Sequence, residues 1–506
     1  MAGCQFRAPA VVLSGRAYPA EIGPALHGTL TASLMLLLTM TAHDLELDDT
    51  VAGEESRPAR RVAAHSRLSD DRRGSAVAMA VVLLFTAILS LTANFRGPGL
   101  SLYDEGTHAD YAWQVAHGHF PAAGSLLAPE IREEFSCHGS AVGAKLPPCG
   151  AQNPPASKYP AGGQNYNWGH PPLYYAITGV LARAIDAVVP GAHFITAARC
   201  VGVLWLWAGL IAMFFALRKF RVPWQYAVVG AATLGLCPGI IGASAAVTND
   251  APAALGGALA LWVLARVLVE KNYGIVLPTV LTVLITATKV MSAISMIGVA
   301  GVCLVMAFLK WRARAIEEAR RLAVLGVSML AGVFVVYKGW AIIQSHRGVA
   351  HWHNPIETVS GRPIKGVPFD ELLRPLFNGS NLALSYFFSA PINGDSVTYW
   401  ARLLNVLFFA APLLALAVFP RGHLGWTLGA MTLGSLIVYP LVVEVQIYTT
   451  SDLYFPVVAP RYGMALIPEV IACLVLVAWH RTTLRMPVIG LCIGGLLLLL
   501  TEAAVL

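Results

Sequence analysis

Two adjacent carboxylates, Asp104 and Glu105, follow the first long apolar stretch of the chain, and His108 comes three residues later. Residues 107–117 are predicted to form a short helix just beyond that stretch. Paired acids at the mouth of a helix are costly to desolvate unless something positive binds there. A carboxylate placed beside a bound hydroxyl group can act as a general base. The alternative is structural, because either acid could cap the helix by accepting hydrogen bonds from its free amides.

A second polar and aromatic group occupies residues 165–175 and contains His170, two prolines and Tyr174. Prolines at positions 171 and 172 predict the start of a helix there. The free amides at a helix N-terminus attract phosphate, and His170 stands beside them. The alternative is a belt of aromatic side chains at a membrane interface, with no ligand.

Three smaller signals complete the set of candidate residues. The dipeptide Asn249-Asp250 forms a turn before a proline, where helix capping is the simpler interpretation. Lys289 is isolated in an apolar stretch, so its charge must find an anion or extend to the membrane surface. Arg461, followed by Tyr462, is suited to bidentate contact with phosphate, and its alternative role is that of an interfacial anchor.

Two cysteines, Cys137 and Cys149, flank a hydrophilic stretch that contains glycine and proline. If this stretch lies outside the membrane, a disulfide is allowed, and we expect one; the alternative is two free thiols. A zinc site is not expected, because the pair has one nearby histidine and zinc needs four ligands.

A later hydrophilic stretch carries three histidines and two acids, whose spacing is not a known zinc pattern. Solvated loop histidines are the preferred interpretation. These residues are His346, His351, His353, Asp370 and Glu371.

Composition places these residues in a membrane protein. Of 506 residues, 56% are hydrophobic and only 12% are charged, and the mean hydropathy is +0.63. A soluble protein carries about 25% charged residues. Repeated apolar runs are each long enough to cross a hydrocarbon core of roughly 30 Å. A soluble enzyme, a nucleic-acid-binding domain and a secreted disulfide scaffold are therefore excluded. The net charge of +7 is attributed to basic residues in loops, which mark the cytoplasmic side of a membrane protein.

The predicted fold is an all-α polytopic membrane protein with about eleven transmembrane helices and with interfacial helices in a large first extracytoplasmic loop. The expected spans are 76–95, 196–217, 224–243, 252–269, 274–288, 290–309, 322–343, 401–419, 424–443, 461–479 and 487–505.

The segment 171–189 is apolar enough to span but contains Arg183 and Asp186. If it lies flat in the interface, the basic connectors, among them 218–221 and 310–321, fall on one side. The other side receives two long loops, 96–195 and 344–400, together with connectors that lack Lys and Arg. The positive-inside rule favours this flat arrangement. The protein is then expected in the plasma membrane, with its N-terminus in the cytoplasm and its two long loops on the outer side.

Residues 1–75 do not fit the pattern of spans. We expect a poorly ordered cytoplasmic tail, with a signal-like segment or a mis-assigned start as alternatives. Residues 76–506 then form the transmembrane domain. The interiors of its helices are almost free of charge, which favours a site at the outer membrane surface over a transport pathway at the midplane.

The order of these groups resembles the GT-C superfamily of membrane glycosyltransferases, which includes protein O-mannosyltransferases and lipid A aminoarabinose transferases. The resemblance rests on Asp104-Glu105 after the first span, on the sequence His-Pro-Pro-Leu-Tyr-Tyr at 170–175, and on Arg199 opening the next span. A bacterial branch of that superfamily also has an Asn-Asp turn, an isolated lysine and an Arg-Tyr pair. The resemblance covers about residues 76–480, and it depends on the order and common sidedness of short motifs.

The resemblance implies a polyprenyl-phosphate sugar as donor and an acceptor hydroxyl on a cell-envelope glycan, lipid or protein. By this resemblance Asp104 or Glu105 is the base of an inverting transfer of a hexose or pentose. The residues implied in substrate binding are His108, His170, Tyr174, Asn249, Asp250, Lys289, Arg461 and Tyr462.

The resemblance leaves a metal cofactor open. Some members hold a divalent cation such as Mg or Mn with their acids, and others do not. The usual second acid of the first loop has no clear counterpart here, although Glu130, Glu133 and Glu134 are candidates.

Three other functions fit the same residues less well. A transporter or flippase of lipid-linked glycans predicts charged or broken helices at the midplane. A polymerase or ligase that joins lipid-linked glycans differs from the transferase mainly in its acceptor, and a scaffold role would need no site at all.

Overall fold

The computed structural model describes residues 72–506, apart from 97–98, 102–103, 140–144, 190–192, 357–361, 364–394, 452, 455–457, 482, 484–489, 491–492 and 496–506. Nearly all of the expected tail 1–75, the acids Asp370 and Glu371, and most of the expected span 487–505 therefore lie outside the described residues.

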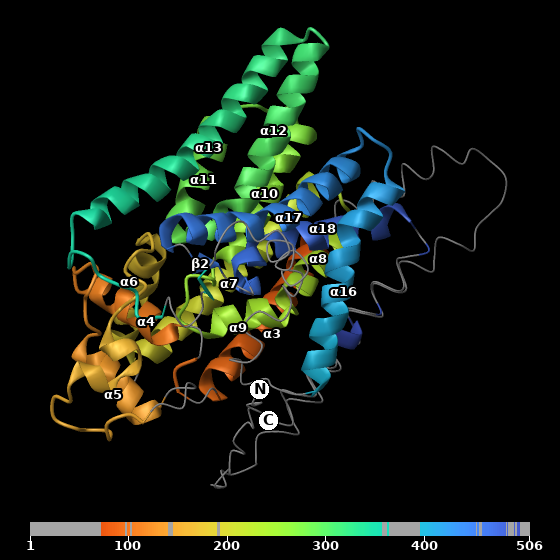
Figure 1. Ribbon diagram of the computed structural model, residues 1–506. Coiled ribbons are helices and arrows are strands. Elements are labelled where there is room, and N and C mark those ends of the chain that lie inside the picture. The colour runs from red at the N-terminus through yellow and green to blue at the C-terminus, as the bar shows by residue number, and fades with distance from the viewer. Residues whose placement is uncertain are drawn as a thin grey trace, which may run out of the picture. The chain divides into compact units, whose positions relative to one another are not determined.

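The described part of the chain is almost entirely helical (Figure 1). In chain order its elements are α3 (Arg72–Arg96), α4 (Glu105–Ala116), α5 (Pro129–His138), η1 (Ala156–Lys158), η2 (Pro160–Gly163), α6 (Leu173–Val188), α7 (Phe194–Lys219), α8 (Trp224–Gly235), α9 (Pro238–Ala245), α10 (Ala253–Leu268), α11 (Val276–Thr288), η3 (Val290–Ala293), α12 (Ile294–Arg312), α13 (Ile316–Ser345), β1 (Arg362–Pro363), α16 (Asp395–Val418), α17 (Leu424–Ser451), β2 (Leu453–Tyr454), η6 (Pro460–Leu466) and α18 (Ile467–His480). The two short strands pair antiparallel.

Long apolar helices make this a polytopic membrane protein, as the composition predicts. Among the described residues, 7 helices are long and apolar enough to cross a membrane, and the bent pair α8–α9 would make 8. Two further apolar helices, α10 and α11, have 16 and 13 residues. Together these segments coincide with every expected span except 487–505.

Two of the expected spans differ in detail from the helices of the structure. The span expected at 224–243 is broken between α8 and α9 by a bend of 62°. Pro238 stands at the first position of α9, where its ring and missing N–H prevent a continuous helix. The span expected to end at 443 continues to Ser451 in α17, so Glu444 lies within a helix and not in a connector.

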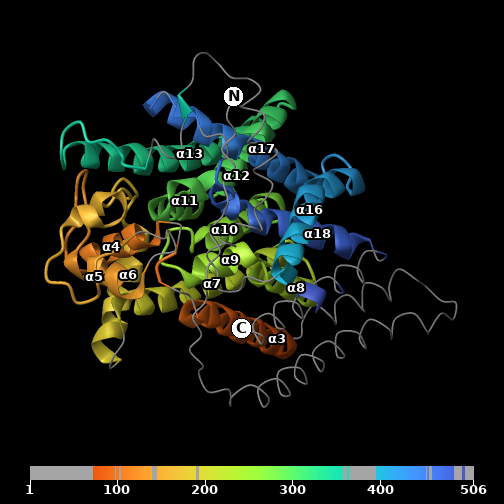
Figure 2. The same cartoon turned by 60° about the horizontal axis from the view of Figure 1, so that its bottom comes forward.

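The first long loop contains two parallel helices, α4 and α6, which lie side by side with α5 nearby (Figure 2). His108 contacts Tyr175, and the Arg183 guanidinium donates to the carbonyl of Ala116, so successive turns of α4 and α6 pair in the same direction. Gly179 permits the close approach, because a Cβ there would lie 2.1 Å from the carbonyl oxygen of Ala112.

The helix α6 has only 16 residues and packs against both α4 and the long span α7. It is not among the described helices that are long and apolar enough to cross a membrane. The flat arrangement of 171–189 in the interface stays a prediction.

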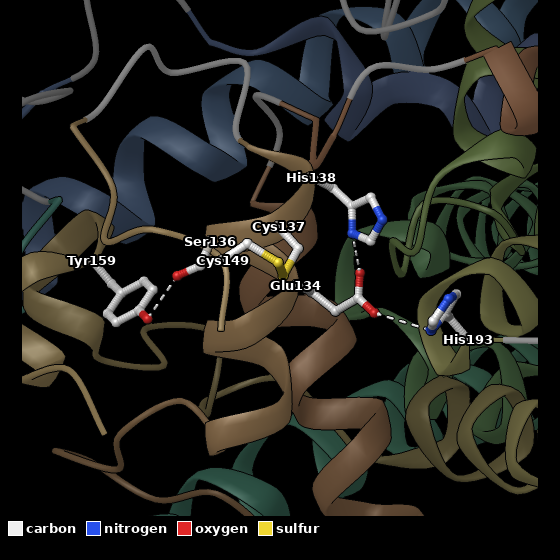
Figure 3. Close-up of a disulfide and its surroundings, with 7 residues drawn as sticks. All are labelled: Glu134, Ser136, Cys137, His138, Cys149, Tyr159 and His193. Atoms are coloured by element: carbon white, nitrogen blue, oxygen red, sulfur yellow. Dashed lines mark hydrogen bonds and ion pairs between the residues drawn. A yellow bond between two sulfur atoms is a disulfide. The ribbon is translucent and has the colours of Figure 1, made fainter. Parts of the chain in front are cut away.

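The expected disulfide between Cys137 and Cys149 is present (Figure 3). It closes the stretch after α5. Beside it, the Glu134 carboxylate lies 2.8 Å from Nδ1 of His138 and 3.9 Å from Nδ1 of His193, which precedes α7. The disulfide therefore closes a segment within the first loop, and Glu134, rather than the disulfide, lies between the end of α5 and the residue before α7.

The basic connectors meet at one end of the helices, as the sidedness argument requires. Lys219 at the end of α7 pairs with Glu270 after α10, at 2.5 Å. Glu318 at the start of α13 accepts hydrogen bonds from Tyr273 and pairs with Lys310 at the end of α12. Three connectors that are distant in sequence therefore share one end.

Candidate active site

Asp104 stands at the N-cap of α4 with its carboxylate directed toward two partners from other segments. Its backbone is left-handed, with φ 60° and ψ 14°. Oδ1 accepts a hydrogen bond of 2.7 Å from the Tyr166 hydroxyl, and Oδ2 accepts one of 2.8 Å from the Arg461 guanidinium. The side chain makes no capping hydrogen bond, because the main-chain carbonyl of Asp104 receives the amides of Thr107 and His108 instead. Helix capping therefore does not explain this carboxylate.

Glu105 lies directly beside Asp104 in sequence but in a different environment. It is fully buried and accepts hydrogen bonds from the amides of Ser101 (2.7 Å) and Val247 (2.9 Å). Arg199 donates to both of its oxygens, at 2.7 and 2.8 Å. Burial alone would raise the pKa of Glu105, but the Arg199 charge and these hydrogen bonds outweigh burial and lower it. Glu105 is thus an ionised carboxylate whose acceptor positions are used by the protein itself.

The residues before α6 reach α4 through aromatic rings. Tyr111 and Tyr175 stack with ring centroids 3.8 Å apart, and the Tyr111 hydroxyl donates to the carbonyl of His170. The His108 ring lies 5.8 Å from that of His170, and its Nδ1 is 2.8 Å from the Tyr175 hydroxyl. The stacked rings fix where the chain enters α6.

Both histidines are neutral at ordinary pH. Burial and the nearby charges of Lys289 and Arg461 lower the pKa of His170 to about 4. Burial, and then the neighbouring His170, lower the pKa of His108 well below its usual value. These imidazoles can exchange hydrogen bonds with a ligand, but they do not supply positive charge to it.

The two cations of the site come from breaks between helices. Lys289 ends α11 in extended conformation before η3, and it forms a buried ion pair with Asp250. Arg461 is in η6. The ring of Tyr462 lies beneath both cations, 5.3 Å from the Lys289 Nζ and 5.5 Å from the Arg461 Cζ.

The structure thus brings together candidate residues from five separate stretches of sequence. His170 lies within electrostatic range of Lys289, Arg461, Asp250 and Asp104. The residues that meet are Asp104, His108, His170, Asp250, Lys289, Arg461 and Tyr462.

Two candidates lie at the border of this group. Tyr174 is buried against Trp205 and next to Thr248, so it supports the turn that carries Asp250. Asn249 is 1% exposed, and its side-chain Nδ2 makes no hydrogen bond within the described part of the chain. A buried donor without a partner is costly, so Asn249 is available to a bound ligand.

A divalent metal does not fit these side chains. Among the described residues, no group of three or more His, Cys, Asp or Glu side chains could hold a metal ion. The Asp104 carboxylate is already in contact with a guanidinium, whose charge repels a dication. Glu134 is engaged by His138 and His193, and Glu130 and Glu133 also lie on α5. The three histidines His346, His351 and His353 are exposed.

Two residues that hold the first loop and the site, Tyr166 and Asp110, carry weaker signals in the sequence. Tyr166 and Asp104 are 62 positions apart, and nothing in sequence spacing predicts their hydrogen bond. Asp110 is buried and holds the first loop through Asn165 and the amide of Ala128. Burial raises its pKa to about 6, although these hydrogen bonds oppose the rise.

Glu469 corrects the expectation that helix interiors are almost free of charge. It is fully buried in α18, and its oxygens make no hydrogen bond of good geometry within the described residues, although the hydroxyls of Ser295 and Thr432 lie beside it. It is readable in the sequence as the one acid of the expected span 461–479.

Neither a protein-family model nor a curated protein matches this sequence. Among solved structures, the chain is similar to the crystal structure of ArnT from Cupriavidus metallidurans bound to undecaprenyl phosphate, with a TM-score of 0.43 and 16% sequence identity over 83% of this chain. The chain spans 64% of the length of that ArnT chain.

Proposed function

We propose that the protein is a GT-C-like membrane glycosyltransferase that moves a sugar from a polyprenyl-phosphate donor to an acceptor hydroxyl on the extracytoplasmic face. The observation that carries the proposal is the contact between Asp104 and Arg461, with Lys289 on the same Tyr462 ring. A base and two phosphate-binding cations then share one site. Donor and acceptor would be held together there, which lowers the entropic part of the barrier.

In the proposed reaction, Asp104 takes the proton of the acceptor hydroxyl as its oxygen attacks the anomeric carbon. The bond from that carbon to the phosphate oxygen breaks on the opposite side, so the anomeric configuration inverts. Arg461 and Lys289 stabilise the negative charge that develops on the leaving phosphate. Asn249 and the neutral imidazole of His170 supply further hydrogen bonds. No step uses a metal ion.

Of the two adjacent acids, we assign the base role to Asp104 and a structural role to Glu105. Asp104 is 18% exposed, whereas the Glu105 side chain is 0% exposed and fully engaged. The nature of the sugar and of the acceptor is a matter for assay with a panel of polyprenyl-phosphate hexoses and pentoses.

The deciding experiment is Asp104→Asn in the purified protein, reconstituted in nanodiscs with a polyprenyl-phosphate sugar and cell-envelope acceptors. We expect transfer to fall by roughly 10²–10⁴-fold, the usual contribution of a general base. Asp186→Asn is the matched control, because Asp186 is an exposed acid on α6 of the same loop. If Asp104→Asn transfers sugar as fast as the control, the base assignment is wrong.

The second candidate is a flippase of lipid-linked glycans, and two observations favour it. The span α8–α9 is bent by 62°, and Glu469 is buried within α18. Broken helices and intramembrane acids are typical of transporters. Movement of a fluorescent polyprenyl-phosphate sugar across proteoliposomes, unchanged by Asp104→Asn, would support this function over the transferase.

A further inference from the structure

The two cations of the site have counter-charges of different kinds. Lys289 and Asp250 are 5% and 1% exposed, and Thr248 holds the Asp250 main chain and carboxylate, so this pair is deep and fixed. Arg461 and Asp104 are 15% and 18% exposed, at the open side of the site. The carboxylate that Arg461 contacts directly is therefore the proposed base itself, while Asp250 acts on Arg461 only from within electrostatic range.

This arrangement has a consequence for charge during the reaction. The donor is a phosphodiester with one negative charge, and the product phosphate carries about −1.5 to −2 near neutral pH. As Asp104 takes the acceptor proton, it becomes neutral. Arg461 thus loses its carboxylate partner in the same step in which the phosphate gains charge.

We infer that Arg461 transfers its ion pair from Asp104 to the leaving phosphate as the sugar moves, and that Tyr166 is the positioning residue that keeps Asp104 aimed during this exchange. The inference rests on the proposed function. The acceptor O–H electron pair stays on the attacking oxygen, the proton goes to Asp104, and the electrons of the sugar–phosphate bond go to the phosphate. The net charge of the site and its ligands is unchanged, so no uncompensated charge arises in a buried place.

Tyr166 is suited to hold Asp104 while Arg461 departs. Its hydroxyl donates to Oδ1, the oxygen that Arg461 does not use. Burial, and then the Asp104 charge, raise the pKa of Tyr166, so it remains a phenol that donates at any working pH.

The binding test uses Asp104→Asn as a mimic of the protonated base. Since Arg461 no longer faces a charged carboxylate at position 104 in this variant, polyprenyl phosphate should bind about tenfold more tightly than to the parent protein. The gain should vanish in the double variant Asp104→Asn/Arg461→Gln. Asp186→Asn serves as the control, with unchanged affinity. Equal affinities of Asp104→Asn and the parent would overturn the exchange of partners.

The kinetic test uses Tyr166→Phe, with Tyr159→Phe as the matched control. Tyr159 belongs to the same loop, but its hydroxyl bonds to Ser136 (Figure 3). Loss of a hydrogen bond to a charged group predicts a fall in kcat of roughly tenfold or more, with the donor KM unchanged.

The outcomes separate the two levels of the proposal. If the parent protein transfers no sugar, the proposed function fails. If Asp104→Asn transfers sugar as fast as the parent, the base assignment and the exchange of partners fail together. If Asp104→Asn is inactive while Tyr166→Phe matches Tyr159→Phe in kcat and in donor KM, only the positioning role is overturned.

Discussion

At the scale of single residues, Asp104 and Glu105 show that the surroundings of a carboxylate decide whether it can serve as a base or only as a structural group. Asp104 has two partners and remains partly open, whereas Glu105 receives two amides and a bidentate guanidinium in a closed position. The first arrangement leaves lone pairs for a substrate proton. The lone pairs of Glu105 are instead used by hydrogen bonds that join the start of α4 to α7 and to the turn before α10.

Glu105→Gln should therefore be a stability variant. It removes the counter-charge of Arg199, which is mostly buried, and breaking a buried pair from one side costs about 3–5 kcal/mol. Thermal and denaturant unfolding in detergent would measure this loss, and Asp104→Asn should stay close to the parent. If Glu105→Gln is as stable as the parent but inactive, Glu105 takes part in the chemistry instead.

The sequence identifies which residues are unusual at this scale, but not how they are divided between structure and chemistry. Lone cations such as Lys289 and Arg461 stand out in apolar surroundings. The separation of Asp104 from Glu105 depends on Arg199, which is 94 positions beyond Glu105. Contacts over such distances follow from the packing of helices, and no local pattern contains them.

At the scale of elements, the cations are carried by interruptions in the helices. Lys289 precedes η3, and Arg461 is in η6. The Ser295 hydroxyl at the start of α12 donates to the carbonyl of Ala465 in η6, which ties the two interruptions together. Irregular backbone of this kind is tolerated inside a membrane protein only where protein or a cavity satisfies its polar groups.

A substitution at Gly257 of α10 tests whether the position of η6 depends on its close contact with α10. A Cβ at Gly257 would lie 1.9 Å from the carbonyl oxygen of Ala465, a main-chain atom of the Arg461 segment. Gly257→Ala should displace η6, costing about 1–3 kcal/mol of stability and at least tenfold in transfer. The measurements are thermal unfolding and initial rate in nanodiscs.

The matched control is Gly301→Ala in α12, where nothing lies within 4 Å of an added Cβ. Alanine is the better helix former, so this variant should be as stable as the parent or slightly more stable. Equal behaviour of the two variants would mean that η6 does not depend on its contact with α10.

The element scale is also where sequence patterns predict most. The length of each apolar stretch locates the spans, because every helix that crosses a bilayer needs an apolar stretch as long as the hydrocarbon core is thick. Pro238 could have indicated the bend in 224–243, yet a proline inside an apolar run can also leave the helix continuous, as Pro412 does within α16. The parallel pairing of α4 and α6 depends on Gly179 and stacked tyrosines, which apolar length does not reveal.

For the whole molecule, the site and the basic connectors occupy opposite ends of the same helices. Arg199 near the start of α7 binds Glu105, and Lys219 at its end binds Glu270. Helix α10 likewise runs from the turn of Asp250 toward Glu270, and α12 runs from the Lys289 break to Lys310. The 26 residues of α7 extend about 39 Å, enough to cross a bilayer. One end is thus rich in short basic turns, and the other carries the candidate site.

The positive-inside rule then predicts that the site faces away from the cytoplasm. Two single-cysteine variants test on which side of the membrane the site lies. Ser157→Cys is in the first loop and Ala313→Cys is in the connector between α12 and α13, and both positions are exposed. A membrane-impermeant maleimide on intact cells should label Ser157→Cys at once and Ala313→Cys only after permeabilisation. The parent protein sets the background, because its described free cysteines are buried or half-buried. Labelling in the reverse order would place the site in the cytoplasm, where a donor used at the outer face could not reach Asp104.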